Sequence, residues 1–206
     1  QKLLHIVNQL LDFRKAESGT LPINVVSGPV ESMTMNVFNL FKENARKRNI
    51  NFHFRSDLKD ELFPVDRMYL ETILMNLLSN AFKFTPDGGE ISLSLWKKEA
   101  VYGFTIRDNG IGIPEEKLSR IFERFYQVDD SQKGSGIGLS LVKLLIDKHR
   151  GTIEVASEIG KFTEFRVILP ADIHVFPAEE QKQDTKASFT LSEPMYSPMD
   201  VSYMEE

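Results

Sequence analysis

The sequence contains no cysteine among its 206 residues. Disulfide scaffolds, cysteine-zinc sites and thiol nucleophiles are therefore excluded, and a reducing compartment such as the cytoplasm is the default expectation. The chain also lacks an apolar run that approaches the roughly 18 residues of a membrane-spanning helix. Hydrophobic residues at 41% and charged residues at 27% exclude a wholly disordered or collagen-like chain. The length allows one domain with appendages or two small domains.

The chain carries no excess of positive charge, since its formal net charge is -5. Residues 171–206 hold eight acidic and two basic side chains, a net charge of -6, whereas residues 1–170 have a net charge of +1. The acidity therefore belongs to the C-terminal segment. Nothing in this balance favours nucleic acid as a partner of the folded part.

The N-terminal segment begins with Gln1 and shows neither a start methionine nor the pattern of a signal peptide, so we expect a piece of a longer protein. Its apolar side chains recur at three- and four-residue steps, at Leu3, Leu4, Val7, Leu10 and Leu11. This spacing predicts a helix with one apolar face over residues 1–18. Because so short a helix is marginal in water, we expect it to pack against another helix of a bundle or coiled coil.

Periodicity over the middle of the chain predicts an α+β domain, with helices packed on a mostly antiparallel sheet. Helical periods cover residues 29–48, 66–84 and 137–149, and Asp66 is the expected N-cap of the second helix. Alternating apolar residues predict strands over 50–55, 91–95, 102–108, 152–157 and 162–169. The long segment 109–136 predicts a lid or binding loop. From Ala171 onward Pro, Ser, Glu and Gln accumulate, which predicts a disordered linker or tail over residues 171–206.

The first of three candidate site segments is Asn76-Leu-Leu-Ser-Asn80, with Lys83 three residues further on. Residues four apart share one face of a helix, and amide oxygens are hard ligands that suit Mg²⁺. Lys83 is close enough along the helix to meet a phosphate bound there. Taken alone, the pattern is equally compatible with two solvated asparagines on an amphipathic helix.

The other two segments are rich in glycine. Asp108-Asn-Gly-Ile-Gly-Ile-Pro114 follows a strand, where a carboxylate can accept a hydrogen bond from an exocyclic amine, and Gly110 and Gly112 let the backbone approach a flat ring. Gly134-Ser-Gly-Ile-Gly-Leu139 leads into a helix, whose first N–H groups can bind phosphate. Each run alone is weak: the first is also typical of an Asx turn, and the second fits neither the dinucleotide fingerprint nor a P-loop. The absence of HRD and DFG segments excludes the protein-kinase interpretation.

In this order, and together with the aromatic segment Ile121-Phe122-Glu-Arg-Phe125-Tyr126, the three segments resemble the ATP-binding domain of sensor histidine kinases of two-component systems, over about residues 21–170. The resemblance implies a two-layer α/β sandwich of the type shared with DNA gyrase, heat-shock chaperones and mismatch-repair ATPases. It implies ATP and Mg²⁺ as ligands. The implied domains are the end of a dimerisation helix over 1–18, the kinase domain over 19–170 and an acidic linker or tail over 171–206.

The resemblance also assigns a role to each position of these motifs. Asn76 and Asn80 serve phosphate and Mg²⁺, and Lys83 contacts phosphate and acts with Asn76 in catalysis. Asp108 reads the adenine amine, beside Gly110 and Gly112. The positions that line the phosphate end are Gly134, Gly136, Gly138 and Leu139, and those that anchor the lid are Phe122 and Phe125.

The implied function is transfer of the γ-phosphate of ATP to a histidine on a dimerisation helix, followed by relay to the aspartate of a receiver domain. Since residues 1–18 look like the end of the second dimerisation helix, the parent protein would be a homodimer. An acidic Pro/Ser segment after the ATP domain is typical of hybrid members, which carry a receiver domain in the same chain. The family resemblance suggests a parent anchored in the inner membrane, with this domain facing the cytoplasm.

The chain departs from the family pattern at two motif positions. Thr72 stands four residues before Asn76, where a carboxylate or an amide is usual, and Glu71 is one step away from that position. Phe162 replaces a glycine in the segment Gly160-Lys-Phe-Thr163, which we interpret as a structural change at a strand entry.

A phosphoacceptor histidine followed by an acidic residue is missing. His5 precedes Ile6, His53 lies on the polar phase of a strand, His149 lies at a helix end that favours a cation, and His174 lies in the tail. We therefore expect this fragment not to autophosphorylate by itself.

Two other classes of protein stay open. An ATP-hydrolysing clamp of the gyrase type needs a carboxylate base where Asn76 stands, and an amide cannot take a proton from water. A non-enzymatic nucleotide-binding module or degenerate scaffold is favoured by Thr72 and Phe162. Phosphotransfer to an added acceptor domain separates a kinase from such a scaffold.

Overall fold

The computed structural model describes residues 22–59, 61–128 and 136–182. The strands in these ranges are β1 (Val26–Gly28), β2 (Asn51–Ser56), β3 (Phe63–Val65), β4 (Glu90–Lys98), β5 (Val101–Asp108), β6 (Thr152–Glu158) and β7 (Phe162–Pro170). The helices are α2 (Val30–Lys47), α3 (Arg67–Phe84), α4 (Glu115–Leu118) and α5 (Gly138–Lys148), followed by the 3-10 turns η1 (Ile173–Val175) and η2 (Ala178–Glu180). The helix expected over 1–18 and the tail beyond residue 182 lie outside the described residues. Across the three described ranges, no helix is long and apolar enough to cross a membrane.

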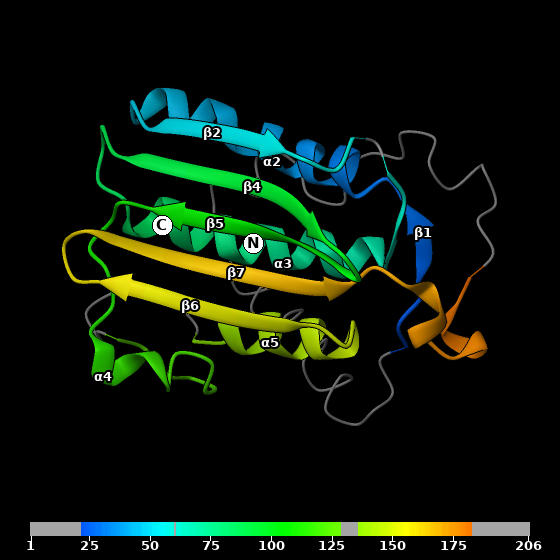
Figure 1. Ribbon diagram of the computed structural model, residues 1–206. Helices are drawn as coiled ribbons and strands as arrows, with labels where there is room; N and C mark the ends of the chain where they lie inside the picture. The colour runs from blue at the N-terminus through cyan, green and yellow to red at the C-terminus, as the bar shows by residue number, and fades with distance from the viewer. Residues whose placement is uncertain (1–21, 60, 129–135, 183–206) are drawn as a thin grey trace, which may run out of the picture.

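Five strands form one sheet in the order β2-β4-β5-β7-β6 (Figure 1). β2 runs parallel to β4, and every other neighbouring pair is antiparallel, which confirms the mostly antiparallel sheet and the predicted β4–β5 hairpin. Because successive side chains of a strand point to opposite faces, Ile91, Leu93 and Leu95 of β4 are buried on one face. The other face carries mostly polar and charged side chains.

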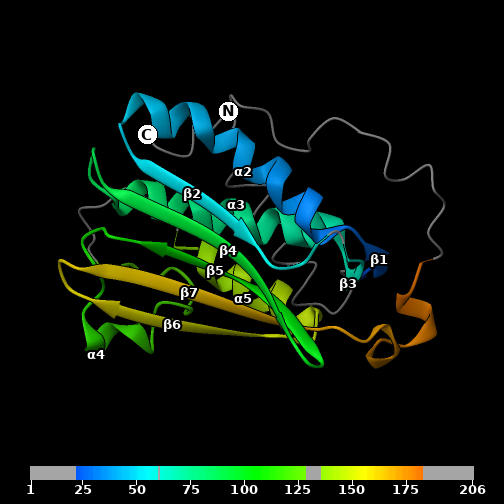
Figure 2. The ribbon, with the colours of Figure 1, turned by 45° about the horizontal axis from the view of Figure 1, so that its top comes forward.

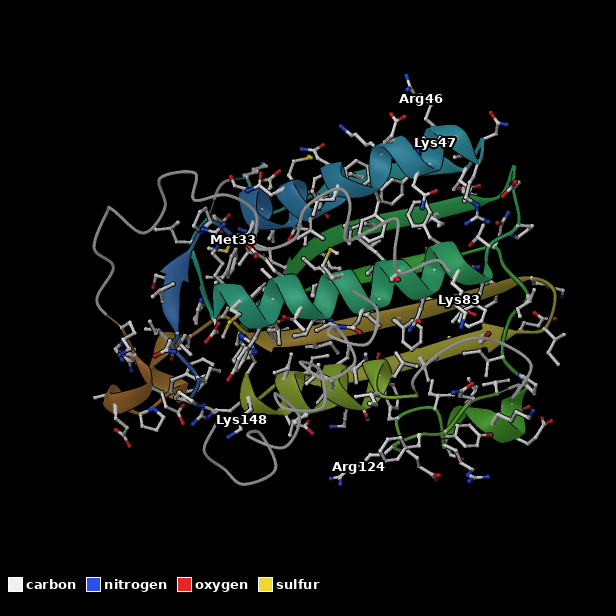
Figure 3. The ribbon with its side chains drawn as sticks, turned by 180° about the vertical axis from the view of Figure 1, so that it is seen from behind. Met33, Arg46, Lys47, Lys83, Arg124 and Lys148 are labelled. Carbon is white, nitrogen blue, oxygen red and sulfur yellow. The ribbon has the colours of Figure 1, made fainter. Side chains whose placement is uncertain are left out.

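Helices α2, α3 and α5 lie on the same face of the sheet (Figures 1 and 2), which confirms the two-layer sandwich. Helix α3 lies between the other two (Figure 3), and ten of its eighteen residues are buried. Its N-cap is Asp66, as predicted, whose carboxylate accepts a hydrogen bond from the N–H of Tyr69 at 3.2 Å. Stacking of Phe41 on Phe82, with ring centroids 5.1 Å apart, joins α2 to α3 in the core.

The described structure continues past the boundary expected at residue 170. Phe176 is only 2% exposed, and the guanidinium of Arg150 lies 4.7 Å from the centre of its ring. The segment then pairs with Val25, whose N–H donates to Glu180 O and whose carbonyl accepts from the N–H of Lys182, both at 2.8 Å. Composition did not indicate this docking, because a single buried aromatic side chain leaves no periodic pattern.

His149 is buried at the end of α5, and its two hydrogen bonds suit a neutral ring rather than the cation expected from its position. Its Nδ1–H donates to the carbonyl of Leu145 at 2.9 Å, and its Nε2 accepts from the N–H of Asp66 at 3.0 Å. Burial lowers the pKa of His149 below its ordinary value. Both ring nitrogens are therefore used in the neutral form, and a second proton on Nε2 would break the bond to Asp66.

We expect the free energy of unfolding to fall as the pH decreases below about 6.5, the ordinary pKa of histidine, because the unfolded chain then binds a proton that folded His149 does not. The slope from one such group is at most about 1.4 kcal/mol per pH unit. His149→Gln keeps a donor and an acceptor but does not titrate, so its unfolding free energy should depend less on pH in urea titrations between pH 7 and 5.

Asp108 also changes the pH dependence of the unfolding free energy, but in the opposite direction. Because both the unmutated chain and His149→Gln contain Asp108, the difference between their pH slopes reports on His149 alone. Burial raises the pKa of Asp108 to about 6, so protonation of that carboxyl favours the folded state as the pH falls. Equal slopes in the parent and in His149→Gln would show that His149 does not carry the acid sensitivity.

Candidate functional site

The candidate residues of the first motif lie on one face of α3. Thr72, Asn76, Asn80 and Lys83 are all partly exposed, while the residues between them are mostly buried. Nδ2 of Asn76 donates to the carbonyl of Thr72 at 2.8 Å, so its amide oxygen is the atom available to a ligand. The predicted sharing of a face by the two asparagines is therefore present in the structure.

The first turn of α5 packs directly on Asn76. A Cβ atom at Gly138 would lie 2.8 Å from Oδ1 of Asn76, so a side chain at that position would displace the amide. No side chain of the described residues caps the start of α5. The first N–H groups of the helix and its positive dipole end therefore lie beside an amide oxygen, an arrangement that suits a phosphate with a bound cation.

Asp108 ends β5 and is 5% exposed. Its Oδ1 accepts a hydrogen bond from the N–H of Gly110 at 2.9 Å, and no described residue donates to Oδ2. Burial raises the pKa of Asp108 to about 6, and the Gly110 N–H and the charge of Arg107 oppose this shift only in part. A buried carboxylate with one unused oxygen is suited to accept a hydrogen bond from an amine.

Thr163 is a site candidate that the sequence pattern did not indicate as functional. It pairs with Asp108 across β5 and β7, is buried, and lies 3.1 Å from the hydroxyl of Ser157. Its position beside the carboxylate depends on strand register, for which the sequence carries no direct signal.

The two glycines after Asp108 are required by packing of the protein itself. A Cβ at Gly110 would lie 2.4 Å from the carbonyl oxygen of Phe84, and one at Gly112 would lie 2.3 Å from that of Glu158. Gly112 also has a φ of +72°. The loop is thus pressed between the end of α3 and the β6–β7 turn. A contact of these glycines with an adenine ring stays a prediction.

The predicted lid includes the unpredicted helix α4, and its two phenylalanines behave differently. Phe122 packs edge-to-face against Phe165 of the core, with centroids 6.4 Å apart. Phe125 is 66% exposed, so its ring does not anchor the lid by burial. Instead its N–H donates to the carbonyl of Gly136 at 2.9 Å, and a Cβ at Gly136 would lie 2.7 Å from its Cα. Leu139 is partly buried against the core, and Gly134 lies outside the described residues.

The two departures from the family pattern do not place new chemistry in the site. The hydroxyl of Thr72 donates to the carbonyl of Met68 at 2.8 Å, and Glu71 is buried in an ion pair with Arg67 at 2.7 Å. The guanidinium of Arg107 lies over the ring of Phe162, 3.8 Å from the ring centre. Because Phe162 directly precedes Thr163 in β7, its side chain points to the opposite face of the sheet.

The fold thus gathers most of the motif residues at one end of the sandwich. Lys83 lies at the C-terminal end of α3 (Figure 3), and the next residue, Phe84, accepts a hydrogen bond from the N–H of Ile111 at 3.2 Å. The oxygen atoms of Asn76 and Asn80, the N-terminal turn of α5 and a buried carboxylate fit the donor set that Mg²⁺ and a purine nucleotide need.

Comparison with known proteins identifies the family of this chain. The family model described as histidine kinase-, DNA gyrase B-, and HSP90-like ATPase matches residues 65–173, just over half of the chain. The chain is 34% identical to "Histidine kinase P4" of Formosa agariphila, over 93% of this chain and 14% of that protein. It is 36% identical to the circadian input-output histidine kinase CikA of Thermosynechococcus vestitus, over 82% of this chain and 24% of that protein. It therefore spans less than a third of the length of these relatives.

Solved structures show the same fold. The catalytic domain of histidine kinase ThkA matches with a TM-score of 0.66 at 29% identity, over 71% of this chain and 97% of that one. Full-length ShkA in complex with AMPPNP matches with a TM-score of 0.75 at 28% identity, over 82% of this chain and 36% of that one. The chain belongs to the family of histidine kinase-, DNA gyrase B- and HSP90-like ATPases, and it contains the ATP-binding catalytic domain of a histidine kinase.

Proposed function

We propose that this chain binds ATP with Mg²⁺ and donates the γ-phosphoryl group to a histidine on a dimerisation helix, for relay to the aspartate of a receiver domain. The observation that carries the proposal is the packing of the first turn of α5 on Asn76. It places backbone N–H donors beside an amide oxygen, as a bound triphosphate with a cation requires. The similarity to ShkA, which was solved in complex with AMPPNP, supports nucleotide binding by this chain.

Each residue has a distinct part in the proposed reaction. Asn76 and Asn80 would hold Mg²⁺, which when bound supplies positive charge to the phosphate oxygens. Asp108 orients the base, and Lys83 offsets the negative charge that develops on the leaving ADP. The bond between the γ-phosphorus and the bridging oxygen breaks as the bond to the imidazole nitrogen forms, in line with the leaving group.

The acceptor histidine lies in another segment of the parent protein. His149 is buried with both ring nitrogens engaged, and His53 and His174 are exposed but are followed by Phe54 and Val175 rather than by an acidic residue. We propose that residues 1–18 continue a dimerisation helix of a homodimer. We further propose that the acidic tail leads to a receiver domain of a hybrid kinase and that the parent is anchored in the inner membrane, with this domain in the cytoplasm.

Thermal unfolding with ATP, with ATP plus Mg²⁺ and with GTP plus Mg²⁺ tests the site first. Ligand at a hundred times its Kd stabilises by about 2.7 kcal/mol, which for a domain of this size raises Tm by about 5–10 °C. We expect a shift of this size for ATP plus Mg²⁺, a smaller one for GTP, and its loss in Asn76→Ala. Asn36→Ala, at an exposed position of α2, is the matched control.

Phosphotransfer is then measured with labelled ATP and an added acceptor helical domain. Label on the acceptor histidine supports the kinase. Binding of ATP without any transfer would favour the scaffold alternative, and release of phosphate without label on the acceptor would favour a hydrolytic clamp. No thermal shift with any nucleotide would contradict the proposed site.

A further inference from the structure

Arg48 directly follows α2, and its guanidinium group makes three hydrogen bonds. Nη1 donates to the carbonyl of Phe82 at 2.5 Å, and Nη2 donates to that of Thr85 at 2.7 Å. Nε donates to Oδ1 of Asp87 at 2.7 Å, and the backbone carbonyl of Arg48 accepts from the N–H of Gly88 at 2.9 Å. The side chain is partly buried, with 25% of its surface exposed. A single residue therefore ties the end of α2 to the end of α3 and to the turn beyond it.

The bonds of Arg48 satisfy carbonyls that the last turn of a helix leaves without an intrahelical donor. The planar guanidinium can reach two carbonyls at once, which the single ammonium group of lysine cannot do in the same geometry. In the same turn, the carbonyl of Phe84 accepts from Ile111 at 3.2 Å and lies against Gly110. The last turn of α3 is thus held by Arg48 on one side and by the loop after Asp108 on the other.

Lys83 lies within this turn, between the carbonyl held by Arg48 and the carbonyl held by Ile111. Figure 3 shows Arg46 and Lys47 at the end of α2, Lys83 at the end of α3, and Arg46 pointing outward from the domain. The position of Lys83 relative to the loop after Asp108 therefore depends on the backbone of residues 82–85, to which Arg48 is hydrogen-bonded.

We infer that Arg48 is a positioning residue for the nucleotide site: it holds the last turn of α3 so that Lys83 and the loop after Asp108 keep the spacing that ATP needs. The inference rests on the proposed function, but it concerns a residue that does not itself touch the nucleotide. Small displacements of positioned groups are costly, since a shift of about 1 Å can reduce a rate by about 100-fold.

The test compares Arg48→Met, Arg48→Lys and the control Arg46→Met. Arg46 lies two residues earlier, is highly exposed and pairs only with Glu43 among the described residues. We expect the Kd for ATP, measured by isothermal titration calorimetry, to rise about tenfold in Arg48→Met, to change less in Arg48→Lys, and to stay within about twofold in Arg46→Met.

A second readout does not require nucleotide. Hydrogen exchange of the Ile111 amide in the free protein should become about tenfold faster in Arg48→Met, while amides of β7 that pair with β5 keep their rates. A role in stability alone would instead speed exchange throughout the domain. An unchanged ATP Kd together with unchanged exchange at Ile111 would overturn the inference. If Arg48→Met does not fold, Arg48→Lys carries both measurements. Failure of the unmutated chain to bind ATP would contradict the proposed function. Hydrogen exchange at Ile111 would still test whether Arg48 holds the last turn of α3.

Discussion

Asp108→Asn is expected to weaken ATP binding by about 10- to 100-fold, the range for loss of a hydrogen bond to a charged group. The reason lies in the hydrogen bond from the N–H of Gly110 to Oδ1 of Asp108. An asparagine must turn its carbonyl oxygen to that N–H, which places its NH₂ group where Oδ2 was. The NH₂ group of the asparagine then faces the amine of adenine, and because both groups are donors, no hydrogen bond forms between them. Since guanine presents a carbonyl oxygen at the same ring position, the variant should discriminate less against GTP.

Calorimetric titration with ATP and GTP measures both effects, and Asp147→Asn is the control because Asp147 is exposed and pairs with Lys143 at the other end of α5. The unmutated chain should also lose ATP affinity as the pH falls through about 6, where Asp108 becomes protonated. The ATP affinity of Asp108→Asn should not show this loss at low pH. ATP affinity equal to that of the parent would remove Asp108 from the base-reading role.

Phe176→Ala is expected to lower the free energy of unfolding by about 3 kcal/mol, at the low end of the range for removal of a buried phenylalanine side chain. For a domain of this size, that corresponds to a fall in Tm of about 6–12 °C. We expect a value at the low end of that range because residues 171–182 lie at the edge of the domain. This segment can open locally without unfolding of the rest, which limits the loss of unfolding free energy. Denaturant unfolding gives the free energy and thermal unfolding gives the Tm.

Val175→Ala provides the matched control, because Val175 precedes Phe176 in the chain but is 43% exposed. Its effect should stay within about 0.5 kcal/mol. A chain that ends at Pro170 should be destabilised at least as much as Phe176→Ala, since it also loses the pairing of Val25 with residues 180–182. A truncated chain as stable as the parent would show that the domain ends at residue 170 after all.

Local patterns predicted the main helices and strands because each depends on residues that are neighbours in the chain. The helix predicted over residues 66–84 is α3, with Asp66 as its cap. Alternation over residues 91–95 and 102–108 likewise predicted the β4–β5 hairpin. Short elements left no signal in the sequence, since the four residues of α4 are too few to show a period.

Charge and burial of single residues were less predictable. The position of His149 at a helix end indicated a cation, but packing buries the ring against Tyr69, with centroids 5.9 Å apart, and uses both ring nitrogens. Phe125 was expected to anchor the lid, but its side chain is 66% exposed and its backbone N–H donates to Gly136. In both cases the deciding neighbour lies far away in the chain or in the long lid segment.

By itself, the sequence determined the type and order of the main helices and strands, the spacing of Asn76, Asn80 and Lys83 on one helix face, and the family that these motifs indicate. Only the tertiary structure decided that Gly138 meets Asn76, that Thr163 stands beside Asp108, and that the last turn of α3 is braced from α2. Spacing along one helix follows from its 3.6-residue period, whereas these contacts require strand register and the packing of three helices on one sheet.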